Sequence, residues 1–199
     1  MKAAAVHKAE SPSAWPSEWV VRWSHLVKPK GRVLDVACGH GRHATYFYEQ
    51  NHPVALVDRA QAAIESIAIG VHGCEKVVAD IENGPWPFAG RQFDAVVVTN
   101  YLWRPLMPTL LASLEPGGVL IYETFSAGNE TVGKPSRPDF LLRPAELLEV
   151  CKGLRVVAFE EGFVPNGNAG SARFIQRIAA VREDSAVPGS SNPKRYPLA

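Results

Sequence analysis

The amino-acid sequence predicts an α/β fold: a doubly wound, mostly parallel seven-stranded sheet with one antiparallel strand near its C-terminal end. Two patterns lead to this prediction. From residue 31 onward, short apolar runs alternate with segments of helical periodicity, which is typical of parallel strands joined by crossover helices. The last two apolar runs are joined by a link rich in turn residues, which favours an antiparallel pair.

The first unit of this alternation covers residues 31–44 and reads GRVLDVACGHGRHA. A short apolar run predicts a buried strand that Asp35 ends with a carboxylate. Gly39 and Gly41 then form a tight turn, where the absent Cβ lets a ligand approach the backbone. A helix follows from Arg42 until the sequence Asn-His-Pro stops it. Such a strand, glycine turn and helix predict a site for a nucleotide-like ligand at the carboxyl edge of the sheet.

Two cofactor classes use this geometry, and the acid separates them. Counted from Gly39, the segment satisfies the dinucleotide fingerprint G-x-G-x-x-A. Counted from Asp35, it reads D-x-x-x-G-x-G; a carboxylate there opposes a pyrophosphate but suits the sulfonium and ammonium groups of S-adenosylmethionine. The segment thereby resembles the first motif of class I S-adenosylmethionine-dependent methyltransferases, which usually have glycine where Ala37 stands. A purely structural strand-to-helix turn is the alternative.

Two further predicted strands also end in an acid. The strand over residues 53–57 ends in Asp58, where a carboxylate can accept from both ribose hydroxyls of either cofactor class. The strand over residues 76–79 ends in Asp80, and in class I methyltransferases the matching position commonly accepts from the adenine amine. The resemblance therefore implies a cofactor site that comprises Asp35, Ala37, Gly39, Gly41, Asp58, Arg59, Asp80, Ile81 and Asn100.

The elements between and after these strands are predicted from the same patterns. A helix is predicted from four apolar residues at i, i+3, i+4 and i+7, namely Ile64, Ile67, Ala68 and Val71. Residues 93–99 and 119–124 are the fourth and fifth strands, and residues 155–159 and 172–181 are the antiparallel pair. After the fourth strand the sequence is Asn-Tyr-Leu, not the Asn-Pro-Pro-Tyr of amine-methylating DNA and protein enzymes, so that chemistry is not supported.

A long segment, residues 125–143, follows the fifth strand. Its glycines and prolines predict a shaped loop, and loops of this length in a compact domain are usually functional. We expect it to form a lid over the methyl acceptor; the alternative is a loop that caps the sheet edge and contacts no ligand. The stretches 128–133 and 138–144 resemble those of small bacterial tellurite-resistance-like methyltransferases. Pro144 then begins a helix predicted to turn Leu147, Leu148 and Cys151 inward.

No catalytic base is identified, because methyl transfer from a sulfonium requires mainly alignment and exclusion of water. Candidates for contact with the acceptor are Tyr101, Arg104, Arg137 and His43, although for His43 a histidine bonded to backbone at a helix N-terminus is the favoured reading. The histidines have no metal-ligand spacing, so no metal is expected. Cys38, Cys74 and Cys151 are interpreted as reduced, mostly buried thiols.

Composition limits the organisation and the partners. A chain of 199 residues suits one domain, predicted at residues 31–182, with an N-terminal segment at 1–30 and a flexible tail at 183–199. Ser17 is predicted to cap a helix that runs to Val27. With 21 basic and 20 acidic residues, no nucleic-acid or membrane partner is indicated. The first residues are charged too early for a signal peptide, so a cytoplasmic location is expected.

The sequence therefore favours an S-adenosylmethionine-dependent methyltransferase that acts on a small-molecule acceptor. A non-catalytic, regulatory S-adenosylmethionine-binding protein is the first alternative. An NAD(P)-dependent oxidoreductase is the second, and both Asp35 and the terminal antiparallel pair disfavour it. The acceptor, the methylated atom and the oligomeric state are left open.

Overall fold

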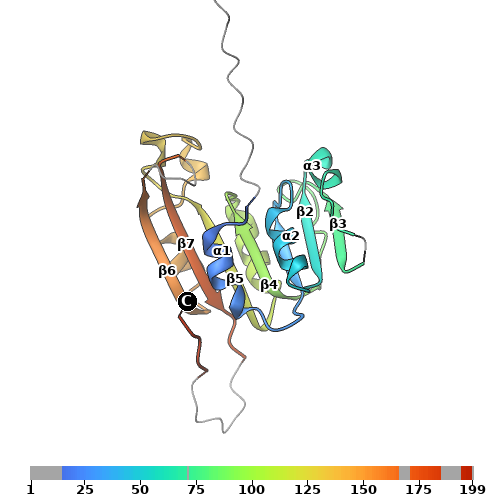
Figure 1. The fold of residues 1–199 in the computed structure, drawn as a ribbon. Helices are drawn as coiled ribbons and strands as arrows, with labels where there is room; N and C mark the ends of the chain where they lie inside the picture. Colours follow the sequence, from blue (N-terminus) through green and yellow to red (C-terminus); the bar gives the residue numbers. More distant parts are fainter. Residues whose placement is uncertain (1–14, 71, 166–170, 185–193, 199) are drawn as a thin grey trace, which may run out of the picture.

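The computed structural model describes residues 15–70, 72–165, 171–184 and 194–198. A seven-stranded sheet runs through it in the order β3-β2-β1-β4-β5-β7-β6 (Figure 1). The strands are β1 (Val33–Val36), β2 (Val54–Asp58), β3 (Cys74–Val78), β4 (Phe93–Thr99), β5 (Leu114–Phe125), β6 (Arg155–Val164) and β7 (Arg173–Val181). The α-helices are α1 (Glu18–Trp23), α2 (Arg42–Glu49), α3 (Gln61–Glu65), α4 (Met107–Ala112) and α5 (Glu146–Val150).

The strand directions confirm the predicted fold class. The strands β1 to β5 pair in parallel, with the first strand of the chain near the middle of the sheet. The last strand, β7, inserts between β5 and β6 and is antiparallel to both. One reversed strand near the C-terminal end therefore distinguishes this sheet from an all-parallel one, and the carboxyl ends of β1 to β5 share one edge.

Each face of the sheet has its own hydrophobic core. Helices α1 and α2 lie on the face turned toward the viewer in Figure 1, where Trp19, Trp23 and Phe47 pack on β1, β2 and β5. Leu110 of α4 and Leu147 of α5 are buried on the opposite face. Side chains alternate between the faces along each strand, so Val33 belongs to the first core and Leu34 to the second.

The N-terminal helix is part of the core. As predicted, Ser17 caps it: the Ser17 side chain accepts from the backbone N–H of Trp19 at 3.1 Å. The α-helix ends at Trp23 and continues as a 3₁₀ turn, Ser24–Leu26, so it is shorter than expected. Trp19 is 1% exposed, and its indole N–H donates to the carbonyl of Ile178 at 3.2 Å. These aromatic side chains therefore stabilise the sheet face.

Three local predictions were wrong. Asp35 does not end its strand: β1 continues to Val36, and all four of its residues are buried. The helix α3 ends at Glu65, so Ile67 is buried outside a helix, while Val71 lies outside the described residues. The Ser66 hydroxyl donates to the carbonyl of Ala63 at 2.7 Å, and such a local bond competes with helix continuation. Leu148 points outward and is 37% exposed, because α5 has only five residues.

The segment between β5 and α5 is a shaped loop, as its glycines and prolines indicated. It contains two 3₁₀ turns, Asn129–Thr131 and Pro138–Phe140, and it rises above the ends of β6 and β7 in Figure 1. Its two ends are held together, because the backbone N–H of Leu142 donates to the carbonyl of Phe125 at 3.0 Å. No helix in the described part of the chain is long and apolar enough to cross a membrane.

Candidate cofactor and acceptor site

The turn between β1 and α2 is open on one side and closely packed on the other. Ala37, Gly39 and Gly41 all have φ between 53° and 69°, a left-handed conformation that glycine adopts most easily. A Cβ built on Gly39 would meet no atom within 4 Å, so a ligand has room to approach the backbone there. A Cβ on Gly41 would lie 2.6 Å from Cδ1 of Ile67, so the Ile67 side chain would have to shift to admit any other residue.

Asp35 is a buried acid directly beneath this turn. Its side chain is 1% exposed, and Oδ2 accepts from the backbone N–H of Ala44, in the first turn of α2, at 3.0 Å. Burial raises the pKa of Asp35 to about 7, although the Ala44 N–H and the Arg42 guanidinium act against this rise. Ionising Asp35 in this buried place costs free energy, and a cation bound beside the carboxylate would offset that cost.

Asp58 connects the end of β2 to the same turn. Its Oδ2 accepts from the backbone N–H of Gly39 at 2.8 Å, and its Oδ1 accepts from that of Ala60 at 2.8 Å. Each carboxylate oxygen has two acceptor sites, so each retains capacity for a ligand hydroxyl. The structure therefore places Asp35, Gly39 and Asp58 together, as the sequence predicted for the carboxyl edge.

Asp80 lies farther along the edge and is exposed. It organises its own turn: Oδ1 accepts from the backbone N–H groups of Glu82 and Asn83, and Oδ2 accepts from the Asn83 side chain at 3.0 Å. The hydrogen bond from the Asn83 side chain, followed by those from the two backbone groups, holds the pKa of Asp80 below its usual value. Ile81 packs against the core beside it, and Arg59 is exposed nearby.

Tyr101 faces this side of the site. Its hydroxyl oxygen is buried and has no hydrogen-bond partner among the described residues. Burial raises the pKa of Tyr101, and the carboxylates of Glu82 and Asp80 raise it further. The tyrosine predicted to contact the acceptor is therefore near the loop that carries Asp80. Asn100, which precedes it, is exposed with φ of 54°, and its backbone N–H donates to the carbonyl of Glu123 at 2.9 Å.

His43 is buried between the N-terminal segment and β4. Its Nε2 accepts from the backbone N–H of Ser17 at 3.2 Å, and its Nδ1 is 3.5 Å from Oγ1 of Thr99. Burial, with a smaller contribution from Arg42, lowers the pKa of His43 to about 3, so the imidazole is neutral at physiological pH. The lone pair of Nε2 is engaged by a backbone N–H, which is the arrangement expected of a histidine bonded to backbone.

The two candidate arginines are both engaged with the loop after β5. Arg104 is bonded to Glu146 and to loop carbonyls. Arg137 is exposed, forms an ion pair of 2.8 Å with Asp139, and lies over the ring of Phe140 at 5.2 Å from its centroid. Both arginines, predicted to contact the acceptor, are thus bonded to side chains and carbonyls of the protein itself. Their positions in the sequence could not reveal these partners.

One polar network near the site was missed. The Ser17 hydroxyl donates to Oε1 of Glu123 at 2.9 Å, and Arg177 donates to Oε2 of the same carboxylate at 3.2 Å. Glu123 is 6% exposed near the carboxyl end of β5, and the guanidinium of Arg177 lies 4.9 Å from the centroid of Trp19. An acid near the end of a fifth buried strand is the signal that could have indicated it.

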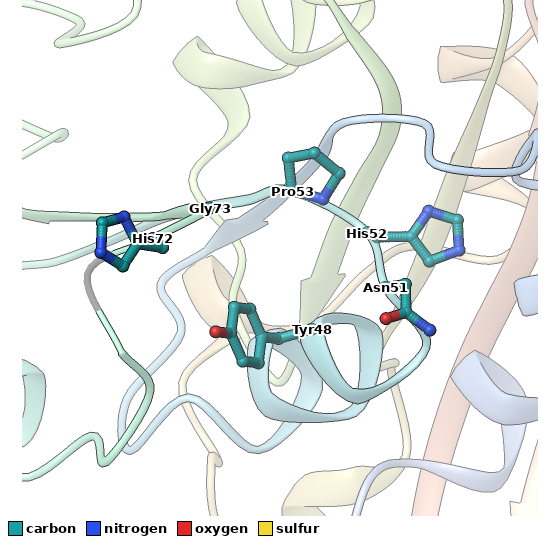
Figure 2. Close-up of a pocket in the computed structure, with 6 residues that line it drawn as sticks. All are labelled: Tyr48, Asn51, His52, Pro53, His72 and Gly73. Carbon is teal, nitrogen blue, oxygen red and sulfur yellow. The ribbon is translucent and has the colours of Figure 1, made fainter.

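A hollow of about 280 Å³ lies away from these residues. Figure 2 shows its lining, with His72 on one side, His52 and Asn51 on the other, and Tyr48, Pro53 and Gly73 between them. Pro53 and Gly73 directly precede β2 and β3, so the hollow is at the amino edge of the sheet, opposite Asp35 and Asp58. Within the described ranges, no group of three metal-ligating side chains is found here or elsewhere.

Comparison with protein families identifies the region that carries the glycine turn. Residues 33–118 match the model of a family described as a methyltransferase domain. Over these residues the chain is similar to methyltransferase domains. The resemblance that residues 31–44 indicated is therefore confirmed, and the matched region includes all of the predicted cofactor-site residues.

Two curated relatives are methyltransferases of longer chains. The chain is 32% identical over 116 residues to phthiotriol/phenolphthiotriol dimycocerosates methyltransferase 1 of Mycobacterium ulcerans. The aligned region covers 54% of this chain and 42% of that protein. The chain is 33% identical over 108 residues to the corresponding protein of Mycobacterium leprae, covering 50% of this chain and 39% of that one. The chain thus spans about two fifths of the curated relatives that it matches.

Solved structures show the same fold at lower identity. TehB from Haemophilus influenzae matches with a TM-score of 0.68 and 18% identity over 82% of this chain and 61% of that chain. The glycopeptide N-methyltransferase MtfA, in a complex with S-adenosylhomocysteine, matches with a TM-score of 0.56 and 18% identity over 81% of this chain and 87% of that chain. At these identities the matches establish the fold of the domain.

Proposed function

We propose that this protein transfers the methyl group of S-adenosylmethionine to a small-molecule acceptor. The observation that carries the proposal is Asp35, a carboxylate 1% exposed beneath a glycine turn that is open to a ligand. A buried acid without a cationic side chain bonded to it in the described residues is suited to a cationic ligand. A dinucleotide would instead place its pyrophosphate near this negative charge.

In this proposal the three acids at or near the carboxyl ends of β1, β2 and β3 hold different parts of the cofactor. Asp35 stabilises the positive charge of the amino-acid moiety. Asp58 accepts from the ribose hydroxyls with the capacity that Gly39 and Ala60 leave on its two oxygens. Asp80 and Ile81 contact the adenine, and the exposed Asn100 and Arg59 border the same opening. The support is the common edge at which these residues lie and the family of the domain.

The cofactor supplies an activated methyl group on a sulfonium, so the protein need only align the acceptor and exclude water. The neutral His43 is unsuited to act as a base in the arrangement described, because its Nε2 already accepts from Ser17. An acceptor whose reacting atom needs no strong base fits this site best. The named relatives act on unlike acceptors, a phthiotriol lipid and a glycopeptide by their names, and so do not select one.

The test is turnover of S-adenosylmethionine to S-adenosylhomocysteine with a panel of small nucleophilic acceptors, followed by mass spectrometry. We expect one acceptor class to gain about 14 mass units, because a methyl group replaces a hydrogen that leaves as a proton, in step with formation of S-adenosylhomocysteine. Tight cofactor binding without turnover on any acceptor would favour the non-catalytic, regulatory alternative.

A further inference from the structure

Arg104 joins three separate parts of the chain. It begins the 3₁₀ turn that follows β4, and its guanidinium reaches both the loop after β5 and the start of α5. Nε and Nη2 donate to the two carboxylate oxygens of Glu146 at 2.7 and 2.9 Å. Nη1 donates to the carbonyl of Asp139 at 2.9 Å, and Nη2 also donates to that of Leu141 at 2.8 Å. These bonds use four of the five N–H groups of a guanidinium.

The carboxylate of Glu146 makes this contact strong. Glu146 is 3% exposed, and its Oε2 also accepts from the backbone N–H of Arg143 at 2.7 Å. A bidentate arginine–carboxylate pair fixes both groups in orientation. The Arg104 side chain is 35% exposed, so the cost of breaking the pair falls on Glu146, whose buried charge would be left uncompensated. The end of the loop, residues 139–143, is thereby fixed to the turn after β4.

A second contact fixes the beginning of the same loop. Asn129 is 1% exposed; its Oδ1 accepts from the backbone N–H of Phe174 at 3.1 Å, and its Nδ2 donates to the carbonyl of Pro135 at 2.9 Å. Between the two contacts, most residues from 130 to 138 are exposed. The loop is therefore held at both ends and presents its middle to solvent.

We propose that Arg104 is a positioning residue that fixes the loop of residues 126–143 as a wall of the acceptor site. Glu146 is its counterpart in α5. The loop is then a wall of preset shape, held against the turn that carries Asn100 and Tyr101. That the wall borders an acceptor rests on the proposed function; that Arg104 fixes the loop does not. Arg104 thus acts on the acceptor through the loop.

The anchoring is tested by hydrogen exchange on the cofactor-free protein. The backbone N–H groups of Ala127 and Leu142 are bonded across the base of the loop, so their exchange reports on its anchoring. Replacing Arg104→Lys retains the charge but loses the bidentate fork. We expect exchange at these two amides to accelerate at least about tenfold, and β1 and β2 to exchange at their original rates.

The matched control is Arg91→Lys. Arg91 also makes a bidentate pair, with Glu75 at 2.9 and 2.7 Å, but on a part of the surface away from the loop. Its replacement should leave exchange at Ala127 and Leu142 unchanged. Glu146→Gln, which keeps the shape of the side chain, serves as the second loop variant and should accelerate the same amides.

Three outcomes would overturn the proposal. Unchanged loop exchange in both Arg104→Lys and Glu146→Gln would show that other contacts fix the loop. Equal acceleration of the loop and of β1 and β2 in Arg104→Lys would show a general contribution to stability. Glu146→Gln also destabilises the whole domain, so it is compared by how much more its loop amides accelerate than those of β1 and β2. With an acceptor in hand, Arg104→Lys should raise its KM about tenfold or more while S-adenosylhomocysteine affinity stays within about twofold. A raised KM without faster loop exchange would instead indicate direct contact with the acceptor. Because the exchange needs no turnover, its result is independent of the proposed function.

Discussion

The two halves of the carboxyl edge differ in what their charged side chains contact. At the ends of β1 and β2, the bonds that Asp35 and Asp58 accept within the described residues come from backbone N–H groups. Beyond β4, Arg104 pairs with Glu146, and Glu123 pairs with Arg177. The first half therefore retains charge for a ligand, whereas the second half uses its charges to hold its own shape.

This difference assigns different kinds of recognition to the two halves. A cofactor with a fixed chemical pattern of cation and ribose hydroxyls can be recognised by preset carboxylates. The acceptor side, in this proposal, discriminates by the shape of a loop anchored at Asn129 and Arg104. Changes in the first half should thus affect cofactor binding, and changes in the second half should affect methyl transfer.

The largest expected effect comes from removing the loop. Replacing residues 128–138 by a short Gly-Ser linker should abolish methyl transfer, because water would reach the sulfonium and the acceptor would lose its wall. Cofactor affinity should remain within about threefold, and this measurement also verifies that the domain is folded. Calorimetry with S-adenosylhomocysteine and a turnover assay provide the two values. A normal rate of transfer by this variant would show that the loop only caps the sheet.

The next effect concerns Asp58. Asp58→Ala should weaken S-adenosylhomocysteine binding by roughly 2 to 4 kcal/mol, the range for two hydrogen bonds to a charged group. Part of this loss comes from the turn, because Gly39 would lose its carboxylate partner. Circular dichroism should show that the fold is retained. An unchanged dissociation constant would remove Asp58 from the cofactor site.

The charged pair in the second half should affect stability in a pH-dependent way. Burial raises the pKa of Glu146, but the hydrogen bonds from Arg104 and Arg143 outweigh it and bring the pKa to about 2. Because the pKa of Glu146 is lowered in the folded state, its full contribution to the free energy of unfolding is present above the unfolded pKa near 4.5. This contribution is lost as the pH falls toward 2. Glu146→Gln should lower the free energy of unfolding by about 2–3 kcal/mol at pH 7.

Urea denaturation of both proteins at pH 7, 4 and 3 measures this difference. The difference in free energy of unfolding between the wild type and Glu146→Gln should become smaller as the pH falls. A difference that stays constant over this range would mean that ionised Glu146 contributes no more than its neutral amide analogue.

The smallest effect sharpens the assignment of Asp35. Its pKa of about 7 means that ionised Asp35 becomes more populated as the pH rises. Affinity for S-adenosylhomocysteine should therefore increase about tenfold from pH 6 to pH 8, and Asp35→Asn should remove this dependence.

Stability should change in the opposite direction. The pKa of Asp35 is higher in the folded state than in the unfolded state. Its contribution to the free energy of unfolding is therefore present below the unfolded pKa near 3.8 and is lost as the pH rises through about 7. The cofactor-free Asp35→Asn variant should be at least as stable as the wild type at pH 8. A destabilised variant would indicate that Asp35 serves the fold and not a ligand.

The sequence was sufficient for features that depend on local order. The glycine turn and the acids at 35, 58 and 80 follow from residues close together in the chain, and β4 has the predicted bounds. The domain matched by the family model begins at residue 33, inside that same motif.

Features that depend on distant pairs could not be predicted. Arg104 meets Glu146 42 positions away, and Ser17 meets Glu123 106 positions away, so no local pattern contains either contact. The predicted helix extends beyond the end of α3 at Glu65, because the apolar spacing of Ile64 and Ile67 also fits a chain that leaves the helix and remains buried. Tertiary packing decides such cases.

The central claim is that the edge formed by Asp35, Gly39 and Asp58 binds a cationic nucleoside cofactor. Calorimetry of the unmodified protein with S-adenosylhomocysteine and with NAD, in parallel at pH 8, tests it most directly. We predict saturable binding of S-adenosylhomocysteine at one site and no measurable heat with NAD, because its pyrophosphate would lie near Asp35. Tight binding of NAD with no response to S-adenosylhomocysteine would contradict the claim.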